Sequence, residues 1–484
     1  MKRTKYRILY YNILVSAFAL VIINLLDLKE AYELMLLYSL NAATVFGLLV
    51  YEEIKLFRGL NMNLLILVGF CMRLVLPSIT KAWGAINGES YAYLIPENDV
   101  TDYMFPTIVW MNIYYSIFLC CLFRFESKYT LEAVIAPFFN KFKVLALTIP
   151  LFIVGIVYNI ITSYIPVGFI PGIINSFLGN MATLAVITQL FAAIYEPTKI
   201  NKSFFNVCII VGIYQAMFFG FYKSAIMMYF VFYLLYYFLR RKYENKSVFT
   251  SKFIVSILLL FITIDLVIYP FMSTKRIVSG WDVTSGGLAT QQYSNLDILA
   301  DVISGRLKQD ENENTATGRL DAIEPNAFFY KECVKRGLRT TELVMNQMEL
   351  LVPRFINPNK HNSQAGLMVY AYATTGTFKN HDTAVSNNYI GQFGSAYLIG
   401  GSIMVILLAF FNGWFIAFYY NFLLKHRNHI LSLFFLLPLI MESLLGFEEV
   451  HDGGLFRAAY DTIMMIGILG LSTFFPRFLT IRTK

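Results

Sequence analysis

Long apolar runs recur along the whole of this sequence. They lie near residues 8–26, 31–51, 59–79, 104–123, 144–163, 169–194, 204–220, 223–239, 253–272, 390–423, 430–446 and 457–475. A helix needs about 20 apolar residues to cross the hydrocarbon core of a bilayer, and most of the runs are close to that length. A water-soluble surface needs roughly a quarter charged residues, whereas only 14% of this chain is charged and 57% is hydrophobic. The sequence therefore predicts an all-α polytopic membrane protein with about twelve transmembrane helices.

Two of these runs need further interpretation. The tenth run, 390–423, is too long for one simple crossing, and we expect an interfacial start around Gly391–Gly401. The seventh and eighth runs are separated only by the residues from Gly220 to Lys223. Their division decides the side of the membrane on which every later loop lies.

The lysines and arginines predict the orientation. With twelve crossings and a cytoplasmic N-terminus, 22 of them fall in cytoplasmic segments, against three in the short outer loops: Lys29, Lys81 and Lys223. Positive charge is enriched on the cytoplasmic side of membrane proteins. We therefore expect a multi-pass protein of the bacterial inner membrane with both termini in the cytoplasm. The formal net charge of +8 then reflects these flanking cations and does not indicate nucleic acid.

One loop, at 273–388, is too polar to span and too long to be a simple connection. It divides the chain into a nine-helix region (1–272), a large extracytoplasmic loop (273–388) and a three-helix region (389–484). Apolar residues at helical spacing predict short helices at 294–307 and 340–351, the second with Thr340 or Thr341 as its N-cap.

A cationic segment within this loop reads LVPRFINPNKHN, from Leu351 to Asn362. Two prolines favour an extended backbone, and Arg354, Lys360 and His361 project from it. Guanidinium and ammonium groups suit phosphate oxygens, and Arg276 is expected on the same outer rim. A phosphate ligand, lipid head groups and acidic partners elsewhere in the loop all remain open as explanations.

A second polar segment, GFEEVHDGGLFRAAYD, runs from Gly446 to Asp461. Glu449 and His451 are candidates to deprotonate a hydroxyl group, and Arg457 lies close by in sequence. An ordinary polar hairpin between two helices explains the same composition. The spacing matches no strong metal signature.

Some charges fall inside or at the edge of apolar runs: Arg73, Lys223, Asp265, Glu442 and Asp461. A charge in hydrocarbon costs at least about 2.5 kcal/mol, so such groups face a polar cavity or a partner. Arg73 and Asp265 are expected toward the outer ends of their helices, so a side chain that reaches the interface and a functional role are equally open for each. In the large loop, Tyr370 and Tyr372 are candidates to stack on sugar rings.

Several motifs are missing from the sequence. It contains no Walker motif, no dinucleotide fingerprint and no HExxH motif. The predicted cytoplasmic loops are short and leave no room for a folded catalytic domain. Any chemistry must therefore take place in the membrane or outside it.

The chain resembles the Wzy-type O-antigen and capsular polysaccharide polymerases in three features. These are the order of helices, a long late outer loop with the pattern Val352-Pro353-Arg354 … Pro358 … Lys360, and the glycine-containing stretch Asn388–Gly401. The family often has proline after the lysine, where this chain has His361. The resemblance implies a lipid-linked glycosyltransferase of the GT-C-like kind, which polymerises oligosaccharide repeat units carried on undecaprenyl diphosphate. It implies no cofactor and no metal, and its partners are lipid-linked oligosaccharides, membrane lipids and a chain-length regulator.

Roles for individual residues follow from this resemblance. Arg276, Arg354 and Lys360 would bind the leaving diphosphate, because cations stabilise its developing charge. His361, Glu449 or His451 would act as the base, and Arg457 would help to hold the lipid phosphate. Two other classes stay open: an O-antigen ligase-type transferase with the same topology, and a transporter of polysaccharide or lipid-linked oligosaccharide.

Overall fold

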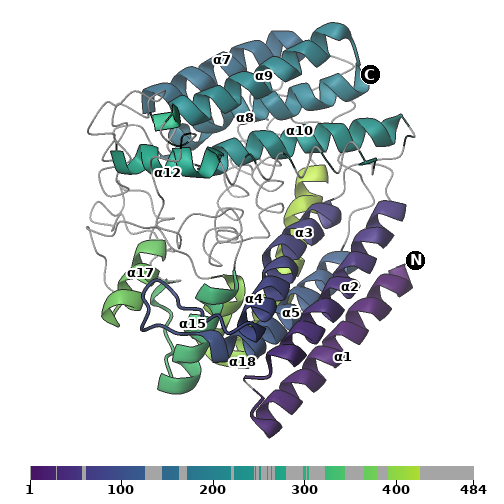
Figure 1. Cartoon of the computed structure of the whole chain (residues 1–484). Helices are drawn as coiled ribbons and strands as arrows, with labels where there is room; N and C mark the ends of the chain where they lie inside the picture. The colour runs from purple at the N-terminus through teal and green to yellow at the C-terminus, as the bar shows by residue number, and fades with distance from the viewer. Residues whose placement is uncertain are drawn as a thin grey trace, which may run out of the picture. The chain divides into compact units, whose positions relative to one another are not determined.

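The computed structural model describes residues 2–28, 30–56, 62–125, 144–162, 172–219, 223–244, 267–278, 322–343, 365–378 and 391–425, with scattered positions between 246 and 304. These ranges are helical apart from their connections (Figure 1). The chain forms two compact units. One comprises Met1–Val134 and Leu320–Arg482, and the other comprises Ile135–Arg319.

The first unit is built from long apolar helices: α1 (Lys2–Leu26), α2 (Tyr32–Leu56), α3 (Met62–Phe70) continued by η1 (Cys71–Val75) and α4 (Leu76–Ile86), α5 (Thr101–Arg124) and α18 (Gln392–Lys425). Two shorter helices, α15 (Ile323–Arg336) and α17 (Ala365–Thr375), complete it. In the described part of the chain, five helical stretches are long and apolar enough to cross a membrane, namely Arg3–Leu26, Tyr32–Lys55, Asn63–Ile86, Thr101–Arg124 and Gln392–Phe422. The chain is therefore a helical membrane protein, as predicted, while the count of twelve crossings stays a prediction.

Polar contacts mark the two ends of the helices in this unit. At one end, Lys5 of α1 pairs with Glu53 of α2 and lies 4.8 Å from the ring centroid of Phe123 in α5. At the other end, the hydroxyl of Tyr32 at the start of α2 donates to Asp102 at the start of α5 (3.3 Å). Helices α1 and α2 therefore run in opposite directions, whereas α2 and α5 run in the same direction.

A buried polar network joins α1, α2 and α5 between these ends. The amide of Asn112 donates to the hydroxyl of Tyr38 (2.6 Å) and to Asn12 (3.2 Å). Asn12 in turn donates to Ser116 (2.8 Å), and Ser16 bonds Tyr38 (2.6 Å). Hydrogen bonds between small polar side chains hold helices together where the surroundings are apolar.

The third long stretch contains a π-helical turn, η1, that carries Arg73. This residue lies near the middle of the candidate span Asn63–Ile86 and is 3% exposed. The expectation that Arg73 reaches the interface from a helix end is therefore wrong. The predicted run ends at residue 79, whereas the helical stretch continues to Ile86 and so places Arg73 near its middle.

Helix α18 packs closely on α5 through Gly413. A Cβ atom at Gly413 would overlap the carbonyl oxygen of Phe118 and lie 3.0 Å from Cβ of Cys121. Beside this contact, the amide of Asn412 donates to the hydroxyl of Tyr114 (2.6 Å), which donates to Gln392 (3.0 Å). Small residues permit such close approach of membrane helices.

The second unit contains α7 (Val144–Thr162), α8 (Gly172–Tyr195), α9 (Lys199–Phe218), α10 (Lys223–Tyr243) and α12 (Tyr269–Val278). Two shorter apolar stretches, Thr148–Thr162 and Met181–Tyr195, belong to α7 and α8. Helix α9 ends at Phe218 and α10 begins at Lys223, so the seventh and eighth runs form separate helices, while two separate membrane crossings stay a prediction.

Candidate functional site

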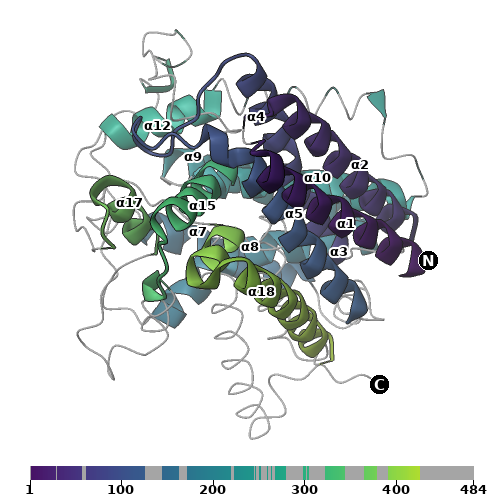
Figure 2. The same ribbon diagram turned by 90° about the horizontal axis from the view of Figure 1, so that it is seen from below.

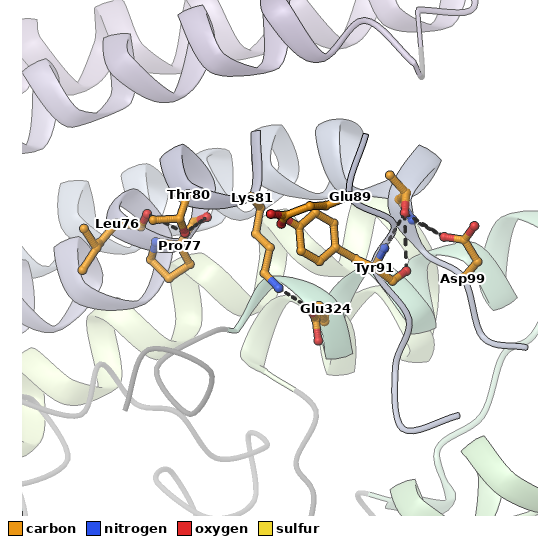
Figure 3. Close-up of polar contacts among 9 residues, drawn as sticks. Leu76, Pro77, Thr80, Lys81, Glu89, Tyr91, Asp99 and Glu324 are labelled. Atoms are coloured by element: carbon orange, nitrogen blue, oxygen red, sulfur yellow. Dashed lines mark hydrogen bonds and ion pairs between the residues drawn. The ribbon is translucent and has the colours of Figure 1, made fainter. Parts of the chain in front are cut away.

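A polar layer lies at the end of the first unit where α4 ends and α5 begins. Lys81 of α4 forms an ion pair with Glu324 in the first turn of α15, and its ammonium nitrogen lies 4.0 Å from the ring centroid of Tyr91 (Figure 3). The Tyr91 hydroxyl donates to Glu89 (2.6 Å). A carboxylate in the first turn also interacts favourably with the dipole of α15. Lys81 therefore fixes the start of α15 against α4 and the segment that follows it.

The segment between α4 and α5 is held in a defined shape. Asp99 accepts hydrogen bonds from the backbone N–H and the hydroxyl of Thr101 (2.9 and 2.8 Å). Ala92 and Asp99 also form an isolated antiparallel β-bridge. Leu94 has a φ of +65°, which is uncommon for a residue other than glycine. Two long-range bonds attach the segment: Lys331 of α15 donates to the Asp99 carbonyl (2.8 Å), and Asn98 donates to the Ala373 carbonyl of α17 (3.0 Å).

Aromatic side chains fill the space between α15 and α17. The ring of Tyr372 stacks on Phe378 with centroids 4.4 Å apart, and its hydroxyl donates to Glu332 (3.1 Å). Burial and the neighbouring carboxylate raise the pKa of the Tyr372 hydroxyl. Tyr372 is only 6% exposed, so its proposed stacking on a sugar ring is not supported. This aromatic core makes the two helices one continuous layer.

The last turn of α15 and the residues after it carry exposed cations. Arg336 pairs with Glu332 (3.3 Å), although its own side chain is 70% exposed. The Lys335 ammonium lies 5.3 Å from the ring centroid of Tyr103, and the Arg339 guanidinium lies 5.4 Å from that of Tyr397. Within the described part of the chain, Lys335 and Arg339 pair with no acidic residue. We call Lys335 and Arg339 the exposed cation pair.

The chain beyond α15 is bound where α18 is broken. Gly400 and Gly401 have non-helical backbone angles, and Gly401 has a φ of +66°, which favours glycine. The N–H of Thr340 donates to the carbonyl of Leu398 (3.2 Å), directly before this break. In Figure 2, α15 lies beside α18. The break falls at the end of the segment expected to be interfacial, Gly391–Gly401.

Most residues predicted for the site lie outside the described residues: Arg354, Lys360, His361, Glu449, His451 and Arg457. Arg276 lies in α12, with its side chain outside the description. Its neighbour Lys275 is buried and donates to the carbonyls of Met217 and Phe218 (both 2.9 Å) at the end of α9. Burial lowers the pKa of Lys275 to about 8.

Parts of the predicted loop helices are described. Positions 298–300 and 302 are helical, within the helix predicted at 294–307. Glu342 and Leu343 begin the helix predicted at 340–351, and the Thr340 hydroxyl accepts a bond from the Glu342 N–H (3.0 Å). This contact agrees with Thr340 as the N-cap.

Helices α15 and α17 were not predicted, although the signals for α15 are present. Its last turn contains Lys335 and Arg336, and Gly337 follows with a φ of +66°. Cations in the last turn and a left-handed glycine after it are common C-terminal signals. Because α15 was not predicted, the exposed cation pair and the Lys81–Glu324 ion pair were not predicted either.

No group of three or more metal-binding side chains occurs among the residues that the structure describes. Comparison of the chain with known protein families, with curated proteins and with solved structures gives no match. The arrangement itself is that of a helical membrane protein whose polar layer presents carboxylates, tyrosines and exposed cations at one end of the first unit.

Proposed function

We propose that this protein polymerises oligosaccharide repeat units carried on undecaprenyl diphosphate, in a bacterial inner membrane. The observation that carries the proposal is the docking of α15 and α17, both from the predicted outer loop, on the ends of membrane helices. Lys81–Glu324, Lys331–Asp99 and Thr340–Leu398 attach α15 and the residues after it, and Asn98–Ala373 attaches α17. A large loop fixed at the membrane mouth can hold the lipid-linked diphosphate and the growing glycan together.

The chemistry needs two kinds of group from the protein, cations for the diphosphate and a base for the acceptor hydroxyl. An acceptor hydroxyl attacks the anomeric carbon of the glycan, the bond from that carbon to the diphosphate oxygen breaks, and the lipid diphosphate leaves with the bond electrons. We assign Arg276, Arg354 and Lys360 to the diphosphate, because fixed cations stabilise its developing charge. A base among His361, Glu449 and His451 takes the hydroxyl proton.

The complete architecture is part of the same proposal. Twelve crossings in a GT-C-like arrangement would place both termini in the cytoplasm and the loop 273–388 outside. Arg457 would then hold the lipid phosphate near the outer surface, and a chain-length regulator would be a partner in the membrane. The packing of α15 and the segment before α5 at the same helix ends supports this arrangement, since both are predicted outer segments.

A gel of surface polysaccharide tests the proposal. Cells that lack the protein are complemented with wild type, with Arg354→Ala or with Arg124→Ala, a control at the predicted cytoplasmic end of α5. Deletion and Arg354→Ala should reduce the ladder of polymer lengths to a single repeat unit, while Arg124→Ala keeps the ladder. Each variant is quantified in the membrane fraction.

Other outcomes separate the competing functions. Polymer of normal length that stays on its lipid and is not transferred indicates a ligase. Lipid-linked repeats that accumulate on the cytoplasmic side indicate a transporter. An unchanged ladder in the deletion strain contradicts the polymerase proposal for that glycan.

A further inference from the structure

The exposed cation pair lies at the beginning of two membrane helices. Lys335 is placed over Tyr103 in the first turn of α5, and Arg339 is placed over Tyr397 in the second turn of α18. Tyr330 lies between the two tyrosines, with its ring centroid 6.4 Å from that of Tyr103 and 4.9 Å from that of Tyr397. Tyrosines gather at the membrane–water interface, where one end of the side chain is apolar and the other is wet.

The exposure pattern of α18 gives the depth of Arg339. Before the helix break, Phe393 and Leu398 are buried, each 1% exposed. After the break, Ile403 is 73%, Leu407 56% and Phe410 55% exposed, at a spacing that places them on one helix face. A guanidinium nitrogen of Arg339 lies 3.4 Å from the position of a Cβ atom at Gly401, directly before this apolar strip. Arg339 is therefore at the level where lipid-facing surface begins.

From this placement, we propose that Lys335 and Arg339 bind the phosphate groups of anionic phospholipids at the lipid-facing side of α18. The two cations are exposed and lack acidic partners in the described part of the chain, and Arg339 lies beside the exposed apolar strip of α18. Guanidinium groups bind phosphate oxygens through paired N–H donors. Contact with Tyr103 and Tyr397 holds both cations in place, so that less side-chain freedom is lost on binding.

The surface favours a phospholipid over an enclosed ligand. Arg339 lies at Gly401, directly before the exposed apolar residues of α18, and Val334, the residue before Lys335, is itself 50% exposed. A membrane phospholipid satisfies both features, with its phosphate on the cations and its acyl chain along Ile403 and Leu407. This inference does not depend on the polymerase activity proposed above.

Photo-crosslinking in nanodiscs tests the site with the full-length protein. The probes are phosphatidylglycerol and phosphatidylcholine with the same diazirine-bearing acyl chain, and crosslinked peptides from 323–343 and 397–410 are quantified by mass spectrometry. Wild type should crosslink phosphatidylglycerol more strongly than phosphatidylcholine in these peptides. Lys335→Gln together with Arg339→Gln should lower the phosphatidylglycerol yield at subsaturating probe by about fivefold for each charge removed.

Two variants act as controls. Arg336→Gln removes a neighbouring exposed charge that is already paired with Glu332, so the phosphatidylglycerol preference should persist. Arg339→Lys keeps the charge and should retain most of the yield that Arg339→Gln loses. Crosslinks in peptides of α9 and α10 should not change in any variant.

Three results would overturn the proposal. The first is equal crosslinking of the two lipids by wild type, which is decisive even if the double variant fails to fold. The second is an unchanged phosphatidylglycerol preference in a correctly folded double variant. The third is displacement of the probe by undecaprenyl diphosphate at a concentration where unlabelled phosphatidylglycerol has no effect, which would assign the cations to a substrate site.

Discussion

Replacing Gly413 by alanine tests the contact that holds α18 against α5. The new Cβ atom would overlap the carbonyl oxygen of Phe118, a backbone atom that cannot rotate away, and would meet Cβ of Cys121 at 3.0 Å. Ordinary van der Waals contacts begin at 3.4 Å. The two helices must therefore separate by roughly 1 Å to regain ordinary contact distances.

The expected cost follows from this overlap. Overpacking a close contact typically destabilises a protein by about 1–3 kcal/mol. The separation also stretches the neighbouring hydrogen bond from Asn412 to the Tyr114 hydroxyl, now 2.6 Å long. A helix gains about 0.5–1 kcal/mol when an interior glycine becomes alanine, which offsets part of the loss.

Gly47→Ala is the matched control, because a Cβ atom at Gly47 of α2 would meet nothing within 4 Å. The free energy of unfolding is measured for both variants by titrating SDS into dodecyl maltoside micelles and following helical circular dichroism. Gly413→Ala should be about 1–3 kcal/mol less stable than Gly47→Ala. Equal stability of the two variants would refute the close packing of α18 on α5.

Two further predictions concern Lys81 and Lys275. Gly84→Ala should push away the side chains of Tyr91 and Glu89, which lie over this glycine, and so speed the labelling of Lys81 by an amine-reactive reagent. A labelling rate equal to that of Gly47→Ala would contradict this packing. Burial holds the pKa of Lys275 at about 8, against about 10.4 in an unfolded chain, so the unfolded protein binds more protons between these values. Between these pH values the free energy of unfolding in the SDS titration should rise with pH, by up to about 1.4 kcal/mol per pH unit. Lys275→Met should remove this rise, and a rise that persists in the variant would belong to another group.

The apolar helices could be predicted from sequence because one local property defines them. The run near 104–123 becomes α5 at Thr101–Arg124, and the run near 144–163 becomes α7 at Val144–Thr162. A membrane requires about 20 apolar residues in succession, so composition along the chain is sufficient. The glycines at the end of the expected interfacial segment likewise mark the break in α18.

The polar layer could not be predicted in the same way. Helix α15 has a mixed sequence, and its buried side depends on aromatic partners in α17, α5 and α18. The pair Lys81–Glu324 joins residues 243 positions apart, a contact that no local pattern specifies. Arg354 and Lys360 stand out in sequence because they lie in a cationic segment with two prolines. Lys335 and Arg339 stand out only once the end of α15 and its tyrosine neighbours are known.

The bond from Lys331 to Asp99 also limits how the intervening chain is threaded through the membrane. Helix α5 begins at Thr101 beside this bond and carries the chain to the opposite end of the first unit at Arg124. The chain must be back at the starting end when α15 begins at Ile323. We therefore expect an odd number of membrane crossings between α5 and α15. Five predicted runs meet this parity, whereas fusing α9 and α10 into one crossing would leave four and place α15 on the wrong side.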